Sequence, residues 1–192
     1  IHADVSDMKA LPVIMEKTLE HYGRLDILVN NAGICPRCSA LEYTEEMWDQ
    51  IIQLNQKSVF FLSQLAARQF VKQKSRGKII NLASMMSFLG GFNTAAYTAS
   101  KSAVAGLTRV CASEWGALGI NVNALAPGWI KTGLSAALVA DTARYESVKA
   151  RIPMGDWGEP DVFKGVAVLL ASSASDYING AIIPVDGGYL TK

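Results

Sequence analysis

The sequence has few cysteines, little net charge and no long apolar run, and each of these absences argues against a class of protein. Its three cysteines cannot all pair with one another in disulfides, which favours a reducing compartment such as the cytoplasm. Acidic and basic residues nearly balance, at a formal net charge of +1, so we expect neither nucleic acid nor a membrane surface as a partner. No apolar run approaches the ~20 residues of a membrane span. These bounds predict one soluble domain over residues 1–192, half of it hydrophobic.

Cysteine and histidine, the usual ligands of zinc, are also scarce. Cys35 and Cys38 have the C-x-x-C spacing of zinc and redox sites, but zinc would need two further ligands, and the only histidines are His2 and His21. A redox pair would open a helix in a thioredoxin-like context, whereas this pair follows an N-N-A-G turn. We therefore expect incidental thiols and no metal site.

The stretch from residue 78 to residue 108 carries the densest chemical signal. A short apolar run at residues 79–82 predicts a buried strand, and a helical pattern begins at about Tyr97. Tyr97 and Lys101 are four residues apart, so they stand on one face of that helix. Ser84 follows the strand at its carboxyl end, where open α/β sheets place their ligands. These three side chains are expected to meet in one crevice.

A hydroxyl, a phenol and an ammonium suit acid–base chemistry on an oxygen atom. A phenol titrates at about 10 in water, too high for a base at neutral pH, and a nearby ammonium favours the phenolate. We therefore expect Lys101 to lower the pKa of Tyr97 towards the working range of a general base. The Ser84 hydroxyl would hold the substrate oxygen against the phenol. A chance pair on a solvated helix face is the alternative reading of Y-x-x-x-K, and the serine at this spacing argues against it.

The set of Ser84, Tyr97 and Lys101, with thirteen positions from serine to tyrosine, resembles the catalytic set of the short-chain dehydrogenase/reductase family. Two further signatures of that family are N-N-A-G at residues 30–33 and P-G-W-I-K-T at residues 127–132. The resemblance implies an NAD(P)-dependent oxidoreductase with a Rossmann-like, doubly wound α/β fold.

The resemblance also assigns further roles. Asn55 would distort its helix and hold a water that relays protons to the catalytic lysine. An Asp-Val pair contacts the adenine ring, N-N-A-G lies by the adenosine ribose, and P-G-x-[IV]-x-T faces the nicotinamide. Carried over, the cofactor-binding residues are Asp4, Val5, Asn30, Ala32, Gly33, Tyr97, Lys101, Pro127, Gly128, Ile130 and Thr132. A helix-capping role for Asp4 is equally open. The cofactor is expected to be NAD, with NADP possible.

Several segments, among them R-I-P-M-G-D-W-G at residues 151–158, place the likeness in the sugar-acid branch of the family. That branch implies hydride exchange between a nicotinamide and a secondary alcohol or ketone of a sugar acid, such as 2-deoxy-gluconate or 2-dehydro-3-deoxy-gluconate. Ser84 and Tyr97 would bind the reacting oxygen. Arg37, or a basic residue of the lid segment 133–160, would bind the carboxylate. The basic residues of that segment are Arg144, Lys149 and Arg151.

Two other functions stay open. A 3-oxoacyl-carrier-protein reductase would share every catalytic residue and differ in its acyl thioester substrate. An inactive or scaffold-like fragment is the third reading, because the glycine-rich phosphate motif G-x-G-x-x-G is nowhere in the chain. Relatives pair the helices that begin near Thr44 and Tyr97 across a subunit interface, so the full-length protein is expected to be a homotetramer.

The resulting fold prediction is a parallel sheet that lacks its first two strands. The family's sheet runs in the order 3-2-1-4-5-6-7, and two missing βα units correspond to roughly 60 residues. Residues 1–5 are expected to be strand three, and the later strands are expected at residues 25–29, 79–82, 120–125 and 181–185. Helices are expected from Pro12, from Thr44, from Tyr97 to about residue 118, and over residues 161–171. Pro184 predicts a sheet edge for the last strand.

Overall fold

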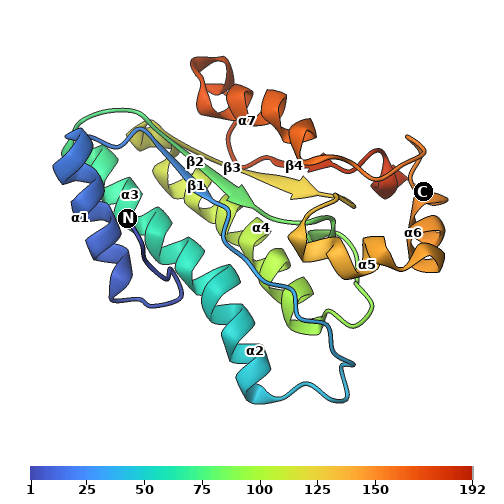
Figure 1. Cartoon of the computed structure of the whole chain (residues 1–192). Coiled ribbons are helices and arrows are strands. Elements are labelled where there is room, and N and C mark those ends of the chain that lie inside the picture. Colours follow the sequence, from blue (N-terminus) through green and yellow to red (C-terminus); the bar gives the residue numbers. More distant parts are fainter. Residues whose placement is uncertain (192) are drawn as a thin grey trace.

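A computed structural model describes residues 1–191 as a four-stranded parallel sheet with helices on both faces (Figure 1). The strands are hydrogen-bonded in the order β1-β2-β3-β4, and their bounds are Ile27–Asn30, Gly77–Leu82, Ile120–Pro127 and Ile182–Val185. The two central strands are buried along almost their whole length, which is why they read as continuous apolar runs. The predicted α/β parallel sheet is confirmed.

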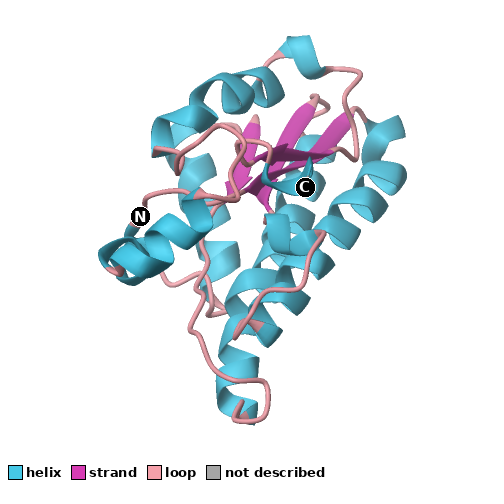
Figure 2. Cartoon of the chain, turned by 90° about the vertical axis from the view of Figure 1, so that its right-hand side faces the viewer, coloured by secondary structure: helices cyan, strands magenta, loops and turns pink. Residues whose placement is uncertain are grey.

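The helices form a layer on each side of this sheet. α3 (Ser58–Lys72) and α4 (Ala95–Trp115) pack on one face, and α1 (Ala10–Tyr22) packs against α3. α7 (Lys164–Ala171) covers β2 from the opposite face, and Figure 2 shows the sheet between these layers. The short helices α5 and α6, over Ala136–Ala140 and Thr142–Lys149, lie beyond the carboxyl ends of the strands.

Local sequence explains where several helices begin and end. Thr44 has extended backbone angles, and its Oγ1 accepts a hydrogen bond from the Met47 N–H at 3.2 Å. α2 (Glu45–Ile52) therefore begins where the sequence predicted. Gly23 takes a positive φ of 74° and donates to the Leu19 carbonyl, which ends α1 at the predicted residue.

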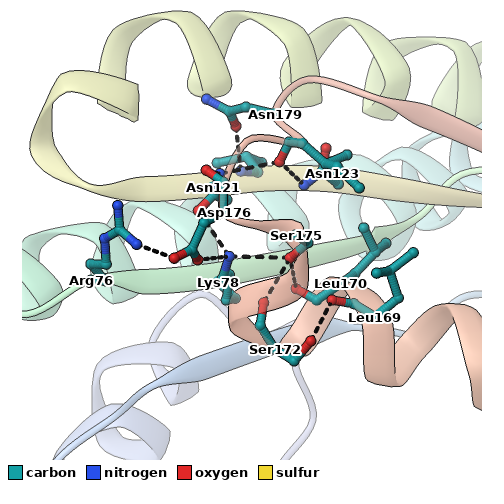
Figure 3. Close-up of polar contacts among 12 residues, drawn as sticks. Arg76, Lys78, Asn121, Asn123, Leu169, Leu170, Ser172, Ser175, Asp176 and Asn179 are labelled. Atoms are coloured by element: carbon teal, nitrogen blue, oxygen red, sulfur yellow. Dashed lines mark hydrogen bonds and ion pairs between the residues drawn. The ribbon is translucent and has the colours of Figure 1, made fainter.

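A polar cluster ties the amino ends of β2 and β3 to the chain that follows α7 (Figure 3). The buried Lys78 ammonium donates to Asp176 at 2.8 Å, to Asn121 at 3.0 Å and to Ser175 at 3.1 Å. Arg76 pairs with the same aspartate from the surface. Because every polar group that Lys78 brings into the interior has a partner, the cluster stabilises this end of the sheet.

Some predicted boundaries are wrong. Residues 1–5 form no strand, although the sequence predicts one there. A strand needs a hydrogen-bonded neighbour, and in the described chain these residues pair with none: β1, at one edge of the sheet, is bonded to β2 alone. The first helix begins at Ala10 rather than Pro12, since a proline is tolerated throughout the first turn, where N–H groups lack an intrahelical acceptor. The segment 133–160, which has no clear pattern in the sequence, contains α5 and α6.

The two edges of the sheet differ. β4 carries Pro184, which confirms the predicted edge position, because proline has no N–H to donate to a further strand. β1 forms the other edge and starts two residues later than predicted, and it exposes Ile27 by 41% and Val29 by 52%. An apolar, unpaired strand edge of this kind can pair with another chain.

Candidate active site

A cavity of about 500 Å³ lies at the carboxyl ends of the strands. Its walls come from the turns after β1, β2 and β3, from the start of α4, from α5 with the turn before it, and from α7 with the turn before it. Six lining residues matter most for its chemistry, namely Gly33, Arg37, Ser84, Tyr97, Lys101 and Trp129. Residues far apart in the sequence thus meet at the sheet edge where α/β folds bind their ligands.

Ser84, Tyr97 and Lys101 line the cavity together. Ser84 lies two residues after the end of β2, and its Oγ accepts a hydrogen bond from the Met86 N–H at 3.1 Å. Tyr97 and Lys101 stand one turn apart on α4, with the lysine Nζ 5.7 Å from the centre of the tyrosine ring. Lys101 is only 4% exposed, and its ammonium donates to the Leu82 carbonyl at 2.6 Å. The lysine is therefore anchored to the strand end beside the phenol.

Burial shifts the pKa of both titratable groups of this set. It raises the pKa of Tyr97 to about 12, an effect that the Ser84 hydroxyl partly offsets. It lowers the pKa of Lys101 to about 8. Burial outweighs the groups that lower the pKa of Tyr97, which are the Ser84 hydroxyl and the charge of Arg37. At neutral pH the Tyr97 phenol is therefore protonated. A lowering of this pKa by Lys101 stays a prediction.

Lys101 should make the stability of the chain depend on pH. Below about pH 8 Lys101 is an ammonium in both the folded and the unfolded state, so burial of the charge lowers the free energy of unfolding by its full amount. Between about pH 8 and the ordinary lysine value of 10.5 the unfolded state binds more protons, so the free energy of unfolding rises with pH. Tyr97, whose pKa is raised, opposes this only above about pH 10, where the unfolded phenol begins to lose its proton.

Urea unfolding of wild type and Lys101→Met at about pH 7.5 and about pH 9.5 checks this dependence. We expect the free energy of unfolding of wild type to gain about 1–2 kcal/mol relative to the variant between those two values. A difference that stays constant would show that the Lys101 ammonium is not penalised by burial.

Asn55 is hydrogen-bonded to the turn after β1. It lies in a π-helical turn, Gln53–Lys57, between α2 and α3, which confirms the predicted distortion of the helix. Its side chain is fully buried, accepting from the Ile34 N–H at 2.9 Å and donating to the Ile34 carbonyl at 2.8 Å. Gly33 packs so closely that an added Cβ would lie 3.3 Å from the Asn55 Oδ1 and 3.7 Å from the Lys101 Nζ. The proton-relay water of Asn55 stays a prediction.

The turn after β3 is held from both sides. The Gly128 N–H donates to the Val185 carbonyl at 3.0 Å, and an added Cβ would lie 2.6 Å from the Asp186 Cα. Only glycine allows this close approach of two backbones. On the other side, the Trp129 carbonyl accepts from the Gly158 N–H at 2.9 Å. The turn is therefore fixed where it borders the cavity.

The charged side chains that line the cavity are all cationic. Among its described lining residues there is no aspartate or glutamate, and the charged side chains are Lys101 and Arg37. Arg37 comes from the loop after β1, and its Nη1 donates to the Phe92 carbonyl at 3.4 Å, which holds the side chain near the start of α4. A cavity with only cationic side chains favours an anionic ligand.

The basic residues of the lid do not share this position. Arg144 is exposed, Lys149 has its Nζ 5.9 Å from the Tyr145 ring centre, and Arg151 lies 4.6 Å from the Tyr189 ring centre. None of these three cations lines the cavity. The structure therefore favours Arg37 over the lid cations as a carboxylate ligand.

Known proteins match this chain over almost its whole length. A family model described as enoyl-(acyl carrier protein) reductase matches residues 1–190. The 2-dehydro-3-deoxy-D-gluconate 5-dehydrogenases of Dickeya dadantii (strain 3937) and Escherichia coli (strain K12) are 54% and 50% identical over 190 residues, covering 99% of this chain and 75% of each relative. The chain belongs to the short-chain dehydrogenase/reductase family.

A solved structure of the short-chain dehydrogenase/reductase family supports the fold. It is a gluconate 5-dehydrogenase from Burkholderia cenocepacia J2315 in complex with NADP and tartrate. It superposes with a TM-score of 0.95 at 37% identity, over 99% of this chain and 74% of that one.

The residues assigned to a dinucleotide from the family pattern fall into two groups. Those that line the cavity are Gly33, Tyr97, Lys101, Pro127, Gly128, Ile130 and Thr132. Asp4, Val5, Asn30 and Ala32 lie outside its lining. The close packing at Gly33 and Gly128 leaves backbone bordering the cavity, which fits the approach of a flat ring and ribose.

Two residues of the second group have visible structural partners. The buried Asn30 donates from its Nδ2 to the Ser63 Oγ at 2.9 Å and to the Asn81 Oδ1 at 2.8 Å, so its side chain braces the sheet. Asp4 is exposed and accepts from the Ser6 N–H at 2.8 Å. It caps a turn and not a helix, since the N-cap of α1 is Lys9.

Sequence reasoning missed the apolar part of the lining. Trp129, Leu134 and Leu138 border the cavity, and the last two come from the lid. The short helix α5 has too few residues to show a helical period, so only a bulky residue within P-G-W-I-K-T could have pointed to this wall.

The cysteines have no shared site in the described residues. Cys35 lines the cavity, while Cys38 forms an isolated backbone bridge to Thr94. All three thiols are free, and no group of three or more His, Cys, Asp and Glu side chains in residues 1–191 is placed to hold a metal ion. Within the same residues, no helix combines the length and the apolar character needed to cross a membrane.

Proposed function

We propose that this chain forms the catalytic part of an NAD(P)-dependent dehydrogenase that acts on a secondary alcohol or ketone of a sugar acid. One observation carries the proposal: the cavity that unites Ser84, Tyr97 and Lys101 has an anion-attracting lining, whose other charged group is Arg37. Relatives named 2-dehydro-3-deoxy-D-gluconate 5-dehydrogenase, and a neighbour with NADP and tartrate, support the same class of substrate and cofactor.

Each catalytic residue has a role that its position supports. Ser84 would bind and orient the reacting oxygen at the end of β2. Tyr97, protonated at neutral pH, would donate its proton to that oxygen in reduction and accept it back in oxidation. Lys101, whose Nζ lies 5.7 Å from the centre of the Tyr97 ring, would stabilise the negative charge of the phenolate as it forms. The nicotinamide, bound beside the turn after β3, would supply or accept the hydride.

A 3-oxoacyl-carrier-protein reductase is the second candidate, because the matching family model describes acyl-carrier-protein chemistry. Two assays of the full-length gene product separate the two: oxidation of 2-dehydro-3-deoxy-D-gluconate and gluconate with NAD or NADP, and reduction of a 3-oxoacyl thioester with NADH or NADPH. We expect turnover of a sugar acid and little of the thioester. The opposite preference would refute the proposal, and turnover of neither would favour the inactive reading. The same assays test the expected preference for NAD.

Arg37 is proposed as the carboxylate ligand of the substrate. We expect Arg37→Ala to raise KM for a sugar acid by about 10- to 100-fold, because a hydrogen bond to a charged group is lost, while KM for the matching neutral sugar changes little. Steady-state kinetics on both substrates measures the difference.

Arg144 offers the control for this prediction, since it is exposed on α6 and does not line the cavity. Arg144→Ala should leave both KM values near those of wild type. Equal effects of Arg37→Ala on the acid and the neutral sugar would remove Arg37 from the carboxylate site.

The finer assignments belong to the same proposal. A homotetramer is supported by α2, α3 and α4, which expose Trp48, Phe61 and Val110 on their outer faces. Sedimentation of the full-length gene product measures its oligomeric state. A cytoplasmic location is supported by the three free thiols.

A further inference from the structure

Two tryptophans that touch each other beside the cavity differ in one respect. The rings of Trp129 and Trp157 are 5.1 Å apart, centre to centre. Trp157 donates from its Nε1 to the Tyr145 carbonyl at 3.2 Å, and its ring stacks on the Tyr145 ring. The Nε1 of Trp129 is buried and has no partner among residues 1–191. The indole N–H of Trp157 thus has a hydrogen-bond acceptor in the structure, and the indole N–H of Trp129 has none among the described residues.

Trp129 holds its position through its backbone and its ring. Its carbonyl accepts from the Gly158 N–H, and its ring also lies 6.3 Å from the Tyr189 ring, centre to centre. It packs against a cluster of buried residues that includes Met85, next to the catalytic Ser84, and Val148 of lid helix α6. Trp129 therefore packs on a cluster that holds residues of both the catalytic segment and the lid, and it lines the cavity.

An unpaired buried N–H destabilises a protein, and a phenylalanine ring would fill an apolar cluster without that cost. The larger indole is therefore not explained by hydrogen bonding in the cluster. What the indole adds at this place is bulk, on a turn whose backbone is fixed on both sides. A rigid, bulky wall limits the length of the molecule that the cavity can accept.

We infer that Trp129 is a specificity-determining residue: its indole closes the substrate side of the cavity, admitting short polyhydroxy acids and excluding long apolar acyl chains. This inference rests on the proposed function, since it assumes that the substrate lies against Ser84 and Tyr97. It explains how a chain whose family model describes acyl-carrier-protein chemistry could act on a sugar acid instead.

The test compares two reactions of the full-length gene product: oxidation of 2-dehydro-3-deoxy-D-gluconate with NAD or NADP, and reduction of a 3-oxo-octanoyl thioester with NADH or NADPH. We expect Trp129→Ala to lower kcat/KM for the sugar acid and to raise it for the thioester. The ratio of the two values should change by at least about tenfold, as expected when a hydrophobic pocket changes size. Trp129→Phe should shift the ratio in the same direction by less.

Trp157→Phe is the matched control, because it removes the hydrogen bond to Tyr145 without touching the cavity lining. A structural change should lower kcat/KM for both substrates together and leave their ratio unchanged. If Trp129→Ala fails to fold, as judged by near-UV circular dichroism, Trp129→Leu and Trp129→Phe decide the question.

Two results would overturn the inference in distinguishable ways. If wild type prefers the sugar acid and the ratio does not move in the Trp129 variants, the wall is refuted while the proposed function stands. If wild type prefers the thioester, the proposed function fails, and the inference fails with it.

Discussion

Replacing Tyr97 by phenylalanine should lower kcat of the full-length gene product by about 10²- to 10⁴-fold, the usual contribution of a positioned acid–base group. The ring would keep its place on α4, and only the hydroxyl that exchanges the proton would be lost. Cofactor affinity, measured by calorimetry with NADP, should stay within about tenfold of wild type, since the variant removes one neutral hydrogen bond at most.

Tyr145 provides the control for this prediction. Its hydroxyl is bonded to Asp156 on the lid, and it does not line the cavity. Tyr145→Phe should therefore change kcat far less than Tyr97→Phe. Near wild-type kcat in Tyr97→Phe would mean that another group transfers the proton.

The 192-residue chain by itself should bind NAD and NADP only weakly, with Kd above about 1 mM. A dinucleotide pyrophosphate is held by a glycine-rich turn and the helix N-terminus that follows it, and this sequence has neither in a recognisable form. β1 also exposes Ile27 and Val29 along an unpaired edge, so we expect the isolated chain to self-associate.

Calorimetry and size-exclusion chromatography test both parts of this prediction. The comparison is a chimera in which the residues that precede the matching region of the Dickeya dadantii relative are joined before Ile1. We expect the chimera to bind a dinucleotide and to elute as one species. Micromolar binding by a monodisperse 192-residue chain would show that the cofactor site is built differently.

The sequence by itself determined the parallel sheet, the meeting of Ser84, Tyr97 and Lys101 in one cavity, and the helix distortion at Asn55. These depend on local rules: buried strands read as apolar runs, Tyr97 and Lys101 share a helix face because they are four residues apart, and Ser84 lies two residues after the end of a strand. Residues 1–5 escaped those rules, because strand formation depends on a neighbour and not on composition alone.

Only the tertiary structure decided the electrostatics and the shape of the cavity. The pKa of Tyr97 depends on how much water the fold removes around the phenol, and spacing on a helix says nothing about that. The presence of Arg37 in the cavity lining, and the position of Trp129 beside Trp157, come from packing between segments that are distant in the sequence. Contacts of this kind are set by how the whole chain fills space, so no local pattern of residues could specify them.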